Sequence, residues 1–320
     1  MTTYDIIGDI HGEAGKLRGL LNTLGYEPDA NGVFRHETNT AVFVGDFIDR
    51  GSQQWDVYQI VRPMVEQGAA LAVAGNHEYN AIGYATLHPD GTDYLRPHDG
   101  QWGPKNLKQH EEFLRQIPFG TPEHREIIAW FTTLPLFLEL DDLRVVHACW
   151  HQPSIDALKA AGLAGGLTTL EMIYAAYDVF GTNRALNAAV EMVLKGPEIP
   201  VAEYGGFYDK DGNYRTDARL RWWLSGETRL RVLADIPLNK QGELQLPDIE
   251  LDLDPTLLYP ATAQPVFFGH YWRTGEPVLL GARAVCVDYS AAREGQPLMA
   301  YRYRAGDDLT QSDFVSFCAA

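Results

Sequence analysis

Three short stretches bounded by glycine decide the fold: Gly8-Asp9-Ile10-His11-Gly12, Gly45-Asp46-Phe47-Ile48-Asp49-Arg50-Gly51 and Gly75-Asn76-His77-Glu78. Each comes directly after a short apolar run, at residues 4–7, 41–44 and 71–74. The shortness of these runs and their β-branched and aromatic residues favour buried strands over helices. The sequence therefore predicts three strands that each end in polar side chains.

Two helices are predicted in the intervals between these strands. Residues 13–24 carry leucines at helical spacing and are followed by Gly25, a frequent helix stop, and residues 54–66 fit a second helix. Strands that alternate with helices indicate an α/β fold with parallel strands. Ligands of such sheets bind beyond the carboxyl ends of the strands, which is where the three glycine-bounded stretches lie.

The polar side chains at these strand ends are suited to metal binding. Asp9 and His11, two residues apart, can offer an oxygen and a nitrogen to one divalent ion. Asp46 could bridge two ions, and two later apolar runs each end in a histidine. The six candidate ligands are Asp9, His11, Asp46, Asn76, His147 and His270. A lone Gly-Asp-x-His is most often a turn, but three ordered motifs together are hard to obtain by chance.

These motifs and the two later histidines resemble the calcineurin-like metallophosphoesterases, in particular their phosphoprotein-phosphatase branch. The resemblance is dense over residues 4–80, recurs near 144–150 and 265–290, and is thin between them. It implies a four-layer α/β/β/α sandwich that forms one domain over residues 1–320. It also implies a metal-dependent enzyme, similar to serine/threonine phosphatases, that hydrolyses phosphate monoesters of proteins or small molecules by in-line attack of metal-bound hydroxide.

The resemblance distributes the metal ligands between two divalent ions, with manganese expected first and iron or zinc as alternatives. Asp9 and His11 would hold the first ion, and Asp46 would bridge the two. The ligands implied for the second ion are Asn76, His147 and His270.

The resemblance also implies the catalytic residues. His77 would act as the general acid that protonates the leaving oxygen, and Asp49 would orient it. Arg50 would clamp the phosphate, since its planar fork suits bidentate oxyanion binding, and Asn76 would help to stabilise the phosphoryl oxygens.

A second phosphate-binding arginine is expected between the two late histidines. Arg219, Arg221 and Arg229 are the candidates, and Arg221 is preferred because it lies beside Trp222-Trp223. That tryptophan pair is itself expected to pack in the core.

The middle of the chain differs from the rest, and we expect it to form a helical cap insertion at about 153–235. Residues 169–180 and 182–195 each fit a helix, with Thr169 and Thr182 as the residues that cap their N-termini.

Some residues depart from the phosphatase pattern and leave the substrate open. His147 is followed by Ala148 where eukaryotic protein phosphatases have glycine, and symmetrical diadenosine tetraphosphate hydrolases share this His-Ala pair. Those hydrolases generally lack the equivalent of Asp49 and have Asp in place of Glu78, so these two residues favour the phosphatase reading. Hydrolysis of dinucleoside tetraphosphates is the alternative. A non-catalytic phosphate-binding protein is disfavoured because no ligand of the pattern is missing.

Composition limits the partners. The chain has 320 residues and a net charge of −17, from 43 Asp and Glu against 26 Lys and Arg. Such acidity disfavours nucleic acid as a partner and is compatible with basic peptides. No apolar run approaches the roughly 18 residues of a membrane helix. Three cysteines without a C-x-x-C pair indicate reduced thiols, so we expect a cytoplasmic protein. The sequence does not indicate the oligomeric state.

Overall fold

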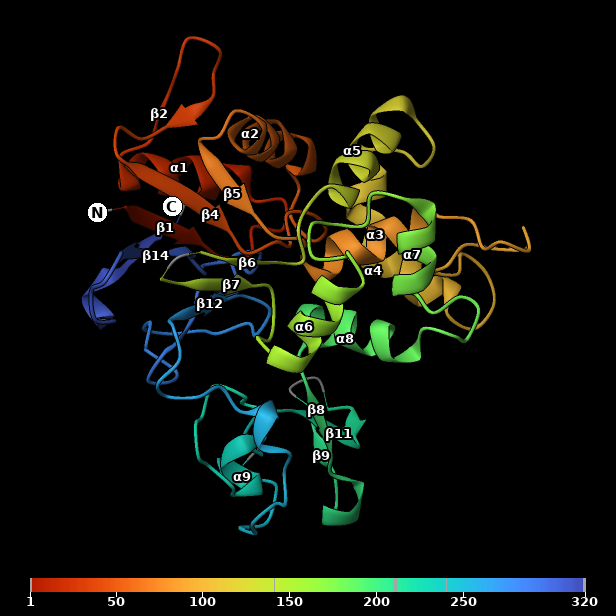
Figure 1. The fold of residues 1–320 in the computed structure, drawn as a ribbon, viewed down its shortest axis with the longest axis vertical. Helices are drawn as coiled ribbons and strands as arrows, with labels where there is room; N and C mark the ends of the chain where they lie inside the picture. The colour runs from red at the N-terminus through yellow and green to blue at the C-terminus, as the bar shows by residue number, and fades with distance from the viewer. Residues whose placement is uncertain (1, 141, 210–211, 240, 319–320) are drawn as a thin grey trace.

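Two β-sheets form the centre of the computed structural model, which describes residues 2–140, 142–209, 212–239 and 241–318 (Figure 1). The first sheet has five strands in the order β15-β14-β1-β4-β5. They are β1 (Thr3–Ile7), β4 (Asn39–Phe43), β5 (Ala70–Ala72), β14 (Leu298–Arg304) and β15 (Phe314–Phe317). β1, β4 and β5 run parallel, whereas β14 is antiparallel to both β1 and β15. The three strands that precede the glycine-bounded stretches are therefore neighbours.

The second sheet has four strands in the order β13-β12-β7-β6. They are β6 (Phe137–Glu139), β7 (Arg144–Val146), β12 (Val266–Phe268) and β13 (Ala284–Cys286). β12 runs parallel to β7 and β13, and β6 is antiparallel to β7. Since β7 and β12 end just before His147 and His270, both histidines leave the sheet at the same edge.

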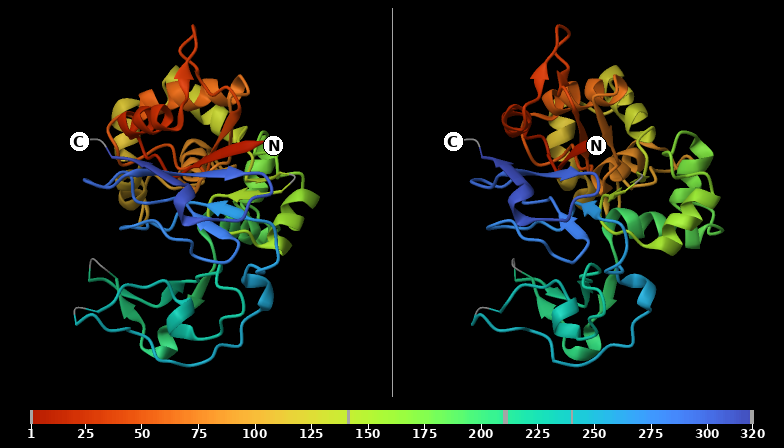
Figure 2. Two further views of the ribbon diagram at one scale, coloured as in Figure 1. Left: turned by 90° about the vertical axis from the view of Figure 1, so that its left-hand side faces the viewer. Right: turned by 60° about the vertical axis from the view of Figure 1, so that its left-hand side comes forward.

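The alternation of side chains along the strands builds two separate cores. Ile6, Val42 and Phe267 lie in a buried cluster between the two sheets, whereas the neighbouring Ile7 and Phe43 face the other way. Two helices cover that outer face of the first sheet (Figure 2), and they are α1 (Ala14–Leu24) and α2 (Gln54–Glu66). The helix predicted at residues 54–66 has these bounds, and the predicted stop at Gly25 takes the left-handed conformation.

The outer face of the second sheet is covered as well. Phe268 packs against Trp222 and Trp223, with ring centroids 4.7 and 5.4 Å apart, so the tryptophan pair belongs to the core as expected. Ala148 N donates a hydrogen bond of 2.9 Å to Val193 O, which ties the end of β7 to a helix. The predicted four-layer α/β/β/α sandwich is thereby confirmed.

Further helices, including the one that contains Val193, lie to the right of the two sheets in Figure 1. They are α3 (Asn76–Ala85), α4 (Gly103–Gln116), α5 (Pro122–Thr132), α6 (Gln152–Ala160), α7 (Leu170–Ala176) and α8 (Arg184–Lys195). Thr169 caps α7 as predicted, because its side chain accepts a hydrogen bond from Met172 N. The cap predicted at Thr182 is wrong, since α8 starts one residue later, after Asn183.

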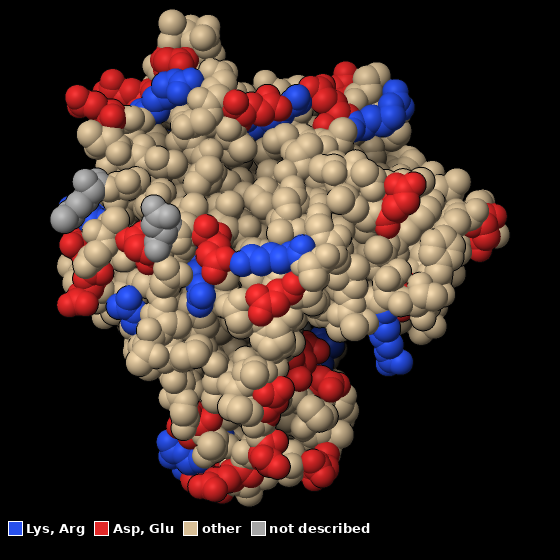
Figure 3. All heavy atoms as spheres, viewed as in Figure 1, with Lys and Arg blue, Asp and Glu red and all other residues tan. Residues whose placement is uncertain are grey.

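The segment after α8 forms a lower lobe in Figure 1 that consists of short pieces. They are β8 (Glu198–Pro200), η1 (Ala202–Tyr204), β9 (Phe207–Tyr208), β10 (Tyr214–Arg215), β11 (Asp217–Arg219), α9 (Leu230–Leu233) and η2 (Pro255–Leu257). Acidic side chains gather on the visible face of this lobe (Figure 3). Within the predicted cap at 153–235, the longer helices end at Lys195, and beyond it the only α-helix among the described residues is the four-residue α9. The division of the chain into a domain and an insertion stays a prediction.

The remaining small elements are β2 (Glu27–Pro28), β3 (Phe34–Arg35) and η3 (Gln311–Asp313). Among the described residues, no helix is both long enough and apolar enough to cross a membrane.

Candidate dinuclear metal centre

The turns after β1 and β4 hold the candidate ligands in an unusual backbone conformation. His11, Asp46, Asp49 and Arg50 have φ angles of 46°, 54°, 68° and 70°, which residues other than glycine rarely adopt. The two turns are joined, because Ile10 N and His11 N both donate to Asp46 O, at 3.1 and 2.9 Å. Backbone strain of this kind persists only where the surroundings impose it, and it concentrates at functional sites.

The structure brings five histidine and aspartate side chains together in two overlapping groups. In each group the potential ligand atoms lie within 4.8 Å of one another, and Asp46 belongs to both. The first group is His11, Asp46 and His77, and the second is Asp46, His147 and His270. Asn76 joins the second group, because its Oδ1 lies 3.0 Å from His147 Nε2 and 2.8 Å from His270 Nδ1.

Asp9 belongs to neither of these two groups, but it is buried on the same turn as His11, two residues before it. Its Oδ2 accepts a hydrogen bond from His270 N at 3.1 Å, but its buried Oδ1 has no hydrogen-bond partner. The buried Nε2 of His11 has none either and lies 3.5 Å from Asp46 Oδ2. Burial raises the pKa of Asp9 and lowers that of His11 to about 3. Burying such groups without hydrogen bonds is unfavourable, and a carboxylate oxygen and an imidazole nitrogen are both atoms that bind divalent ions.

Backbone carbonyls orient two of the three candidate imidazole ligands. His11 Nδ1 lies 2.8 Å from Ile48 O, and His147 Nδ1 lies 2.8 Å from Val44 O. A hydrogen bond donated from Nδ1 leaves Nε2 unprotonated and directed at the centre, which is how proteins fix metal-binding histidines.

Asp49 lies between two histidines, only one of which was predicted. His77 Nδ1 is 2.5 Å from Asp49 Oδ2, and His110 Nδ1, from α4, is 2.7 Å from Asp49 Oδ1. Burial alone would lower the pKa of His77, but Asp46 and Asp49 raise it above its usual value. Sequence reasoning missed His110 because it stands outside every motif, 61 residues after Asp49.

Glu78 has a positioning role that its motif did not reveal. Its buried carboxylate accepts hydrogen bonds of 2.8 Å from the backbone N–H groups of Gly75, Asp46 and Phe47. It therefore fixes the turn that carries Asp46 to the start of α3, which carries Asn76.

Asp288 is a further buried carboxylate, to which no role was assigned from the sequence. It accepts hydrogen bonds from Trp272 N at 2.7 Å and Ser290 N at 2.9 Å. Trp272 in turn lies under Arg50, whose guanidinium carbon is 3.8 Å from the ring centroid. The fork of Arg50 is thereby oriented beside His77, Asn76 and His270, with which it lines one cavity of about 650 Å³.

The structure does not bring Arg221 to the centre. Arg221 forms an ion pair with Asp235, at 3.1 Å, and lines none of the cavities beside the candidate ligands. Arg229 pairs with Glu227 at 2.8 Å. Arg219 Nη1 instead donates to His270 O at 3.3 Å and lines both cavities, so we replace Arg221 by Arg219 as the candidate second phosphate-binding arginine.

A second cavity, of about 630 Å³, opens from the same centre toward α4 and α8. Both cavities reach Asn76, His270 and Arg219, together with Lys105 and Gln109 of α4. The candidate centre therefore lies where two spaces large enough for a substrate meet.

This fold and centre define a metallophosphoesterase. The sequence profile of the family described as "Calcineurin-like phosphoesterase" matches residues 2–179. The chain belongs to this family of metal-dependent hydrolases, as the resemblance of its motifs predicted.

Individual relatives cover only parts of the chain. The asymmetrical bis(5'-nucleosyl)-tetraphosphatase PrpE of Bacillus velezensis is 33% identical over 147 residues, which is 45% of this chain and 55% of that protein. The symmetrical bis(5'-nucleosyl)-tetraphosphatase of Aromatoleum aromaticum is 28% identical over 229 residues, 72% of this chain and 63% of that protein. The chain thus matches less than two thirds of the length of either relative.

Among solved structures, a serine/threonine phosphatase from Saccharomyces cerevisiae with similarity to human PP5 has a similar fold. Its TM-score is 0.52 at 16% sequence identity, and the match covers 100% of this chain and 80% of that one. At this identity the likeness concerns the fold alone.

Proposed function

We propose that this chain hydrolyses phosphate monoesters, carried on a protein or on a small molecule. The observation that supports this choice is the hydrogen bond of 2.5 Å between His77 Nδ1 and Asp49 Oδ2. An imidazole that is held by a carboxylate and whose pKa is raised can protonate a departing alkoxide, the poor leaving group of a serine or sugar ester. A phosphoanhydride has less need of such an acid, because its leaving group is a weaker base.

We propose that the six candidate ligands hold two divalent ions, manganese first, with iron or zinc as alternatives. Asp9 and His11 are assigned to one ion and Asp46 to both, in keeping with the two groups that share Asp46. The second ion is assigned to Asn76, His147 and His270. When bound, divalent ions polarise phosphoryl oxygens and lower the pKa of water, a chemistry that the side chains alone do not supply.

The other side chains then bind and orient the substrate. Arg50, flat on Trp272, offers its fork to two phosphoryl oxygens, and Arg219 and Asn76 face the same space. Asp49 holds the proton on Nδ1 of His77 so that Nε2 carries the proton to be given away. His110 fixes Asp49 from its other oxygen.

A dinucleoside tetraphosphate is the second candidate substrate. Similarity to the two bis(5'-nucleosyl)-tetraphosphatases supports it, and so does the cavity of about 630 Å³, which has cationic walls and is lined by the half-exposed ring of Trp102. An indole ring in such a place can stack on a nucleobase.

One parallel assay separates the two candidates. The metal-loaded protein is tested on phosphoserine, phosphothreonine and phosphotyrosine peptides, on nitrophenyl phosphate and on diadenosine tetraphosphate. Monoester hydrolysis should have the highest kcat/KM. A preference for diadenosine tetraphosphate by orders of magnitude would replace the first candidate by the second.

A further inference from the structure

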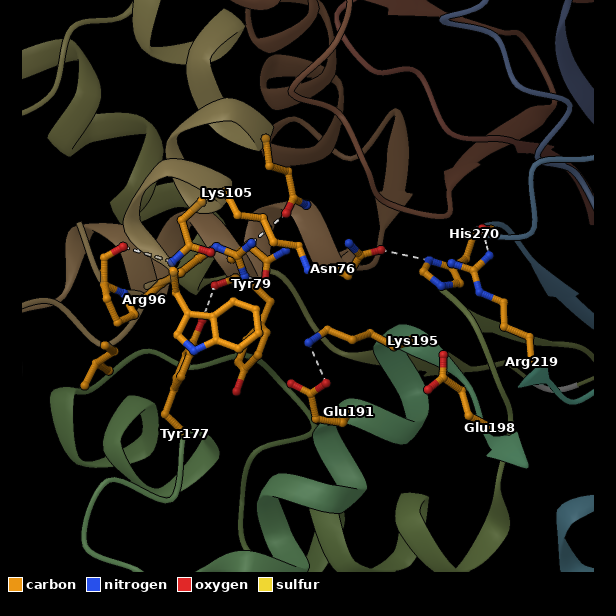
Figure 4. A pocket seen from close by; sticks show the side chains of 16 residues that line it. Asn76, Tyr79, Arg96, Lys105, Tyr177, Glu191, Lys195, Glu198, Arg219 and His270 are labelled. Carbon is orange, nitrogen blue, oxygen red and sulfur yellow. Dashed lines mark hydrogen bonds and ion pairs between the residues drawn. The ribbon is translucent and has the colours of Figure 1, made fainter. Parts of the chain in front are cut away.

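The cavity of about 630 Å³ has a charge opposite to that of the protein as a whole. Four cationic and two acidic side chains line it, in a chain whose net charge is −17. The cations are Arg96, Lys105, Lys195 and Arg219, and the acids are Glu191 and Glu198 (Figure 4). Concentrating positive charge in a concave site raises the local concentration of anions, so the cavity is suited to a negatively charged occupant.

Among these cations, Arg96 gives the strongest indication of an anionic ligand. It is partly buried, and its Nη1 donates to Asn80 Oδ1 of α3 at 2.8 Å while its Nη2 donates to Gln109 Oε1 of α4 at 2.6 Å. Both partners are neutral amides, and within the described part of the chain no carboxylate lies within 4.0 Å of Arg96 to form an ion pair. Asp49 and Glu191 favour the charge of Arg96 from farther away, so the guanidinium is held in place without a direct ion pair.

Such an arrangement favours an external anion. A guanidinium has five N–H groups, and the two amides engage only two of them. Burial lowers the pKa of Arg96, which means that removal from water disfavours its charge. An anionic ligand beside the guanidinium would favour its charged form again. The planar fork of arginine also matches the oxygens of a phosphate group.

The position of this arginine links it to the candidate centre. The same cavity reaches Asn76 and His270, and Lys195 stands on the wall formed by α8, paired with Glu191 at 2.5 Å (Figure 4). One molecule can therefore place a phosphoryl group at the metal candidates and a second anionic group near Arg96.

We propose that Arg96, assisted by Lys195, binds a second phosphate group that the substrate carries on its leaving group. The inference rests on the proposed phosphoesterase function, and it applies to a bisphosphorylated monoester as well as to a polyphosphate chain. Arg96 would then select substrates by charge at a distance from the bond that is broken.

A purely structural role makes a different prediction. Because Arg96 joins α3 to α4, it could act only as a brace, and its loss would then lower stability without changing which ligands bind. A pair of ligands that differ only in the second anion separates the two roles.

The experiment is a calorimetric titration of the metal-loaded protein with phenylphosphonate and with 1,4-phenylenediphosphonate, neither of which can be hydrolysed. The wild type should bind the diphosphonate at least tenfold more tightly than the monophosphonate. Arg96→Gln should reduce this ratio to less than threefold. Arg125→Gln, which removes the same charge from α5 outside the cavities, should keep it.

Lys195→Gln serves as a second variant in case Arg96→Gln does not fold, because it breaks no hydrogen bond between α3 and α4. It should also lower the ratio. A ratio near one in the wild type would overturn the proposal, and so would a wild-type ratio in both variants. The proposal would also fail if Arg96→Gln weakened binding of a phosphoserine peptide with a flanking glutamate but left binding of the diphosphonate unchanged. Absence of nitrophenyl phosphate hydrolysis with the ratio intact would count against the proposed function alone.

Discussion

The candidate metal centre and the cavity beside it are built in opposite ways. In the centre, the candidate ligands lie on strand-end turns that backbone hydrogen bonds hold, as when Ile10 N and His11 N donate to Asp46 O. In the cavity, Arg96 is held by side chains from two helices and belongs to no strand-end turn. The metal centre depends on residues that are neighbours in sequence, so a motif reveals it. The position of Arg96 depends on contacts between residues distant in sequence, so no motif reveals it.

This difference suggests that the centre and the cavity have separate roles. The centre supplies chemistry that must be kept at fixed geometry, while the cavity supplies selectivity that can vary with the residues of α4 and α8. Changes in the centre should therefore affect every substrate, and changes farther out should affect only some substrates or only stability.

The largest effect should come from Asp46, the candidate ligand that both groups share. Asp46→Asn removes the carboxylate common to both groups of ligand atoms, so it should lower kcat by about a thousandfold or more, equivalent to roughly 4 kcal/mol. Elemental analysis should show fewer bound ions per chain. A variant that keeps wild-type turnover and metal content would show that Asp46 is not a ligand.

The next effect should depend on the leaving group. His77→Asn removes the proposed general acid, and kcat on an alkyl phosphate should fall about 100-fold. On nitrophenyl phosphate, whose leaving group needs no proton, the loss should stay below about tenfold. Steady-state kinetics on both esters measures the contrast, and equal losses on the two would contradict the assignment.

His110 should have a weaker effect of the same kind. His110→Asn takes the second hydrogen bond from Asp49, so turnover of the alkyl phosphate should fall about tenfold, which corresponds to about 1.4 kcal/mol. Turnover of nitrophenyl phosphate should hardly change. His124→Leu is the matched control, since this buried neighbour does not bond to Asp49. A uniform loss on both esters would indicate that His110 serves stability only.

The smallest effect concerns stability and pH. Burial, with smaller contributions from His110 and Arg125, lowers the pKa of His124 from 6.5 to about 4, and its Nε2 has no hydrogen-bond partner. Since the unfolded chain binds a proton first, the contribution of His124 to stability is complete above pH 6.5 and is lost as the pH falls toward 4. Between pH 7.5 and 5.5 the loss should be about 1 kcal/mol.

Urea unfolding at the two pH values measures this loss in the wild type and in His124→Leu. The variant should lack that part of the pH dependence. An identical change of unfolding free energy in both proteins would mean that His124 titrates in the folded state as it does in the unfolded state.

Local patterns were enough to predict much of the sandwich. The helix at Gln54–Glu66 has the predicted bounds, because its apolar periodicity is a property of the segment itself. The cap at Thr182 failed since α8 begins after Asn183, a difference of one residue that periodicity does not resolve.

The residues that sequence reasoning missed act over long distances. Arg219 and Arg221 are two residues apart, and only the packing of the lower lobe decides that Arg221 meets Asp235 while Arg219 meets His270. Likewise His110 and Arg96 gain their roles only when α4 lies against the strand-end turns. No spacing rule connects such residues.

The central claim is that two divalent ions in this centre carry the hydrolysis. The most direct test strips the protein of metal, titrates manganese back, and measures both the ions bound per chain and the hydrolysis of nitrophenyl phosphate. We predict no hydrolysis in the stripped protein and recovery that is complete when two ions are bound. Undiminished hydrolysis by protein shown to be free of metal would contradict the claim.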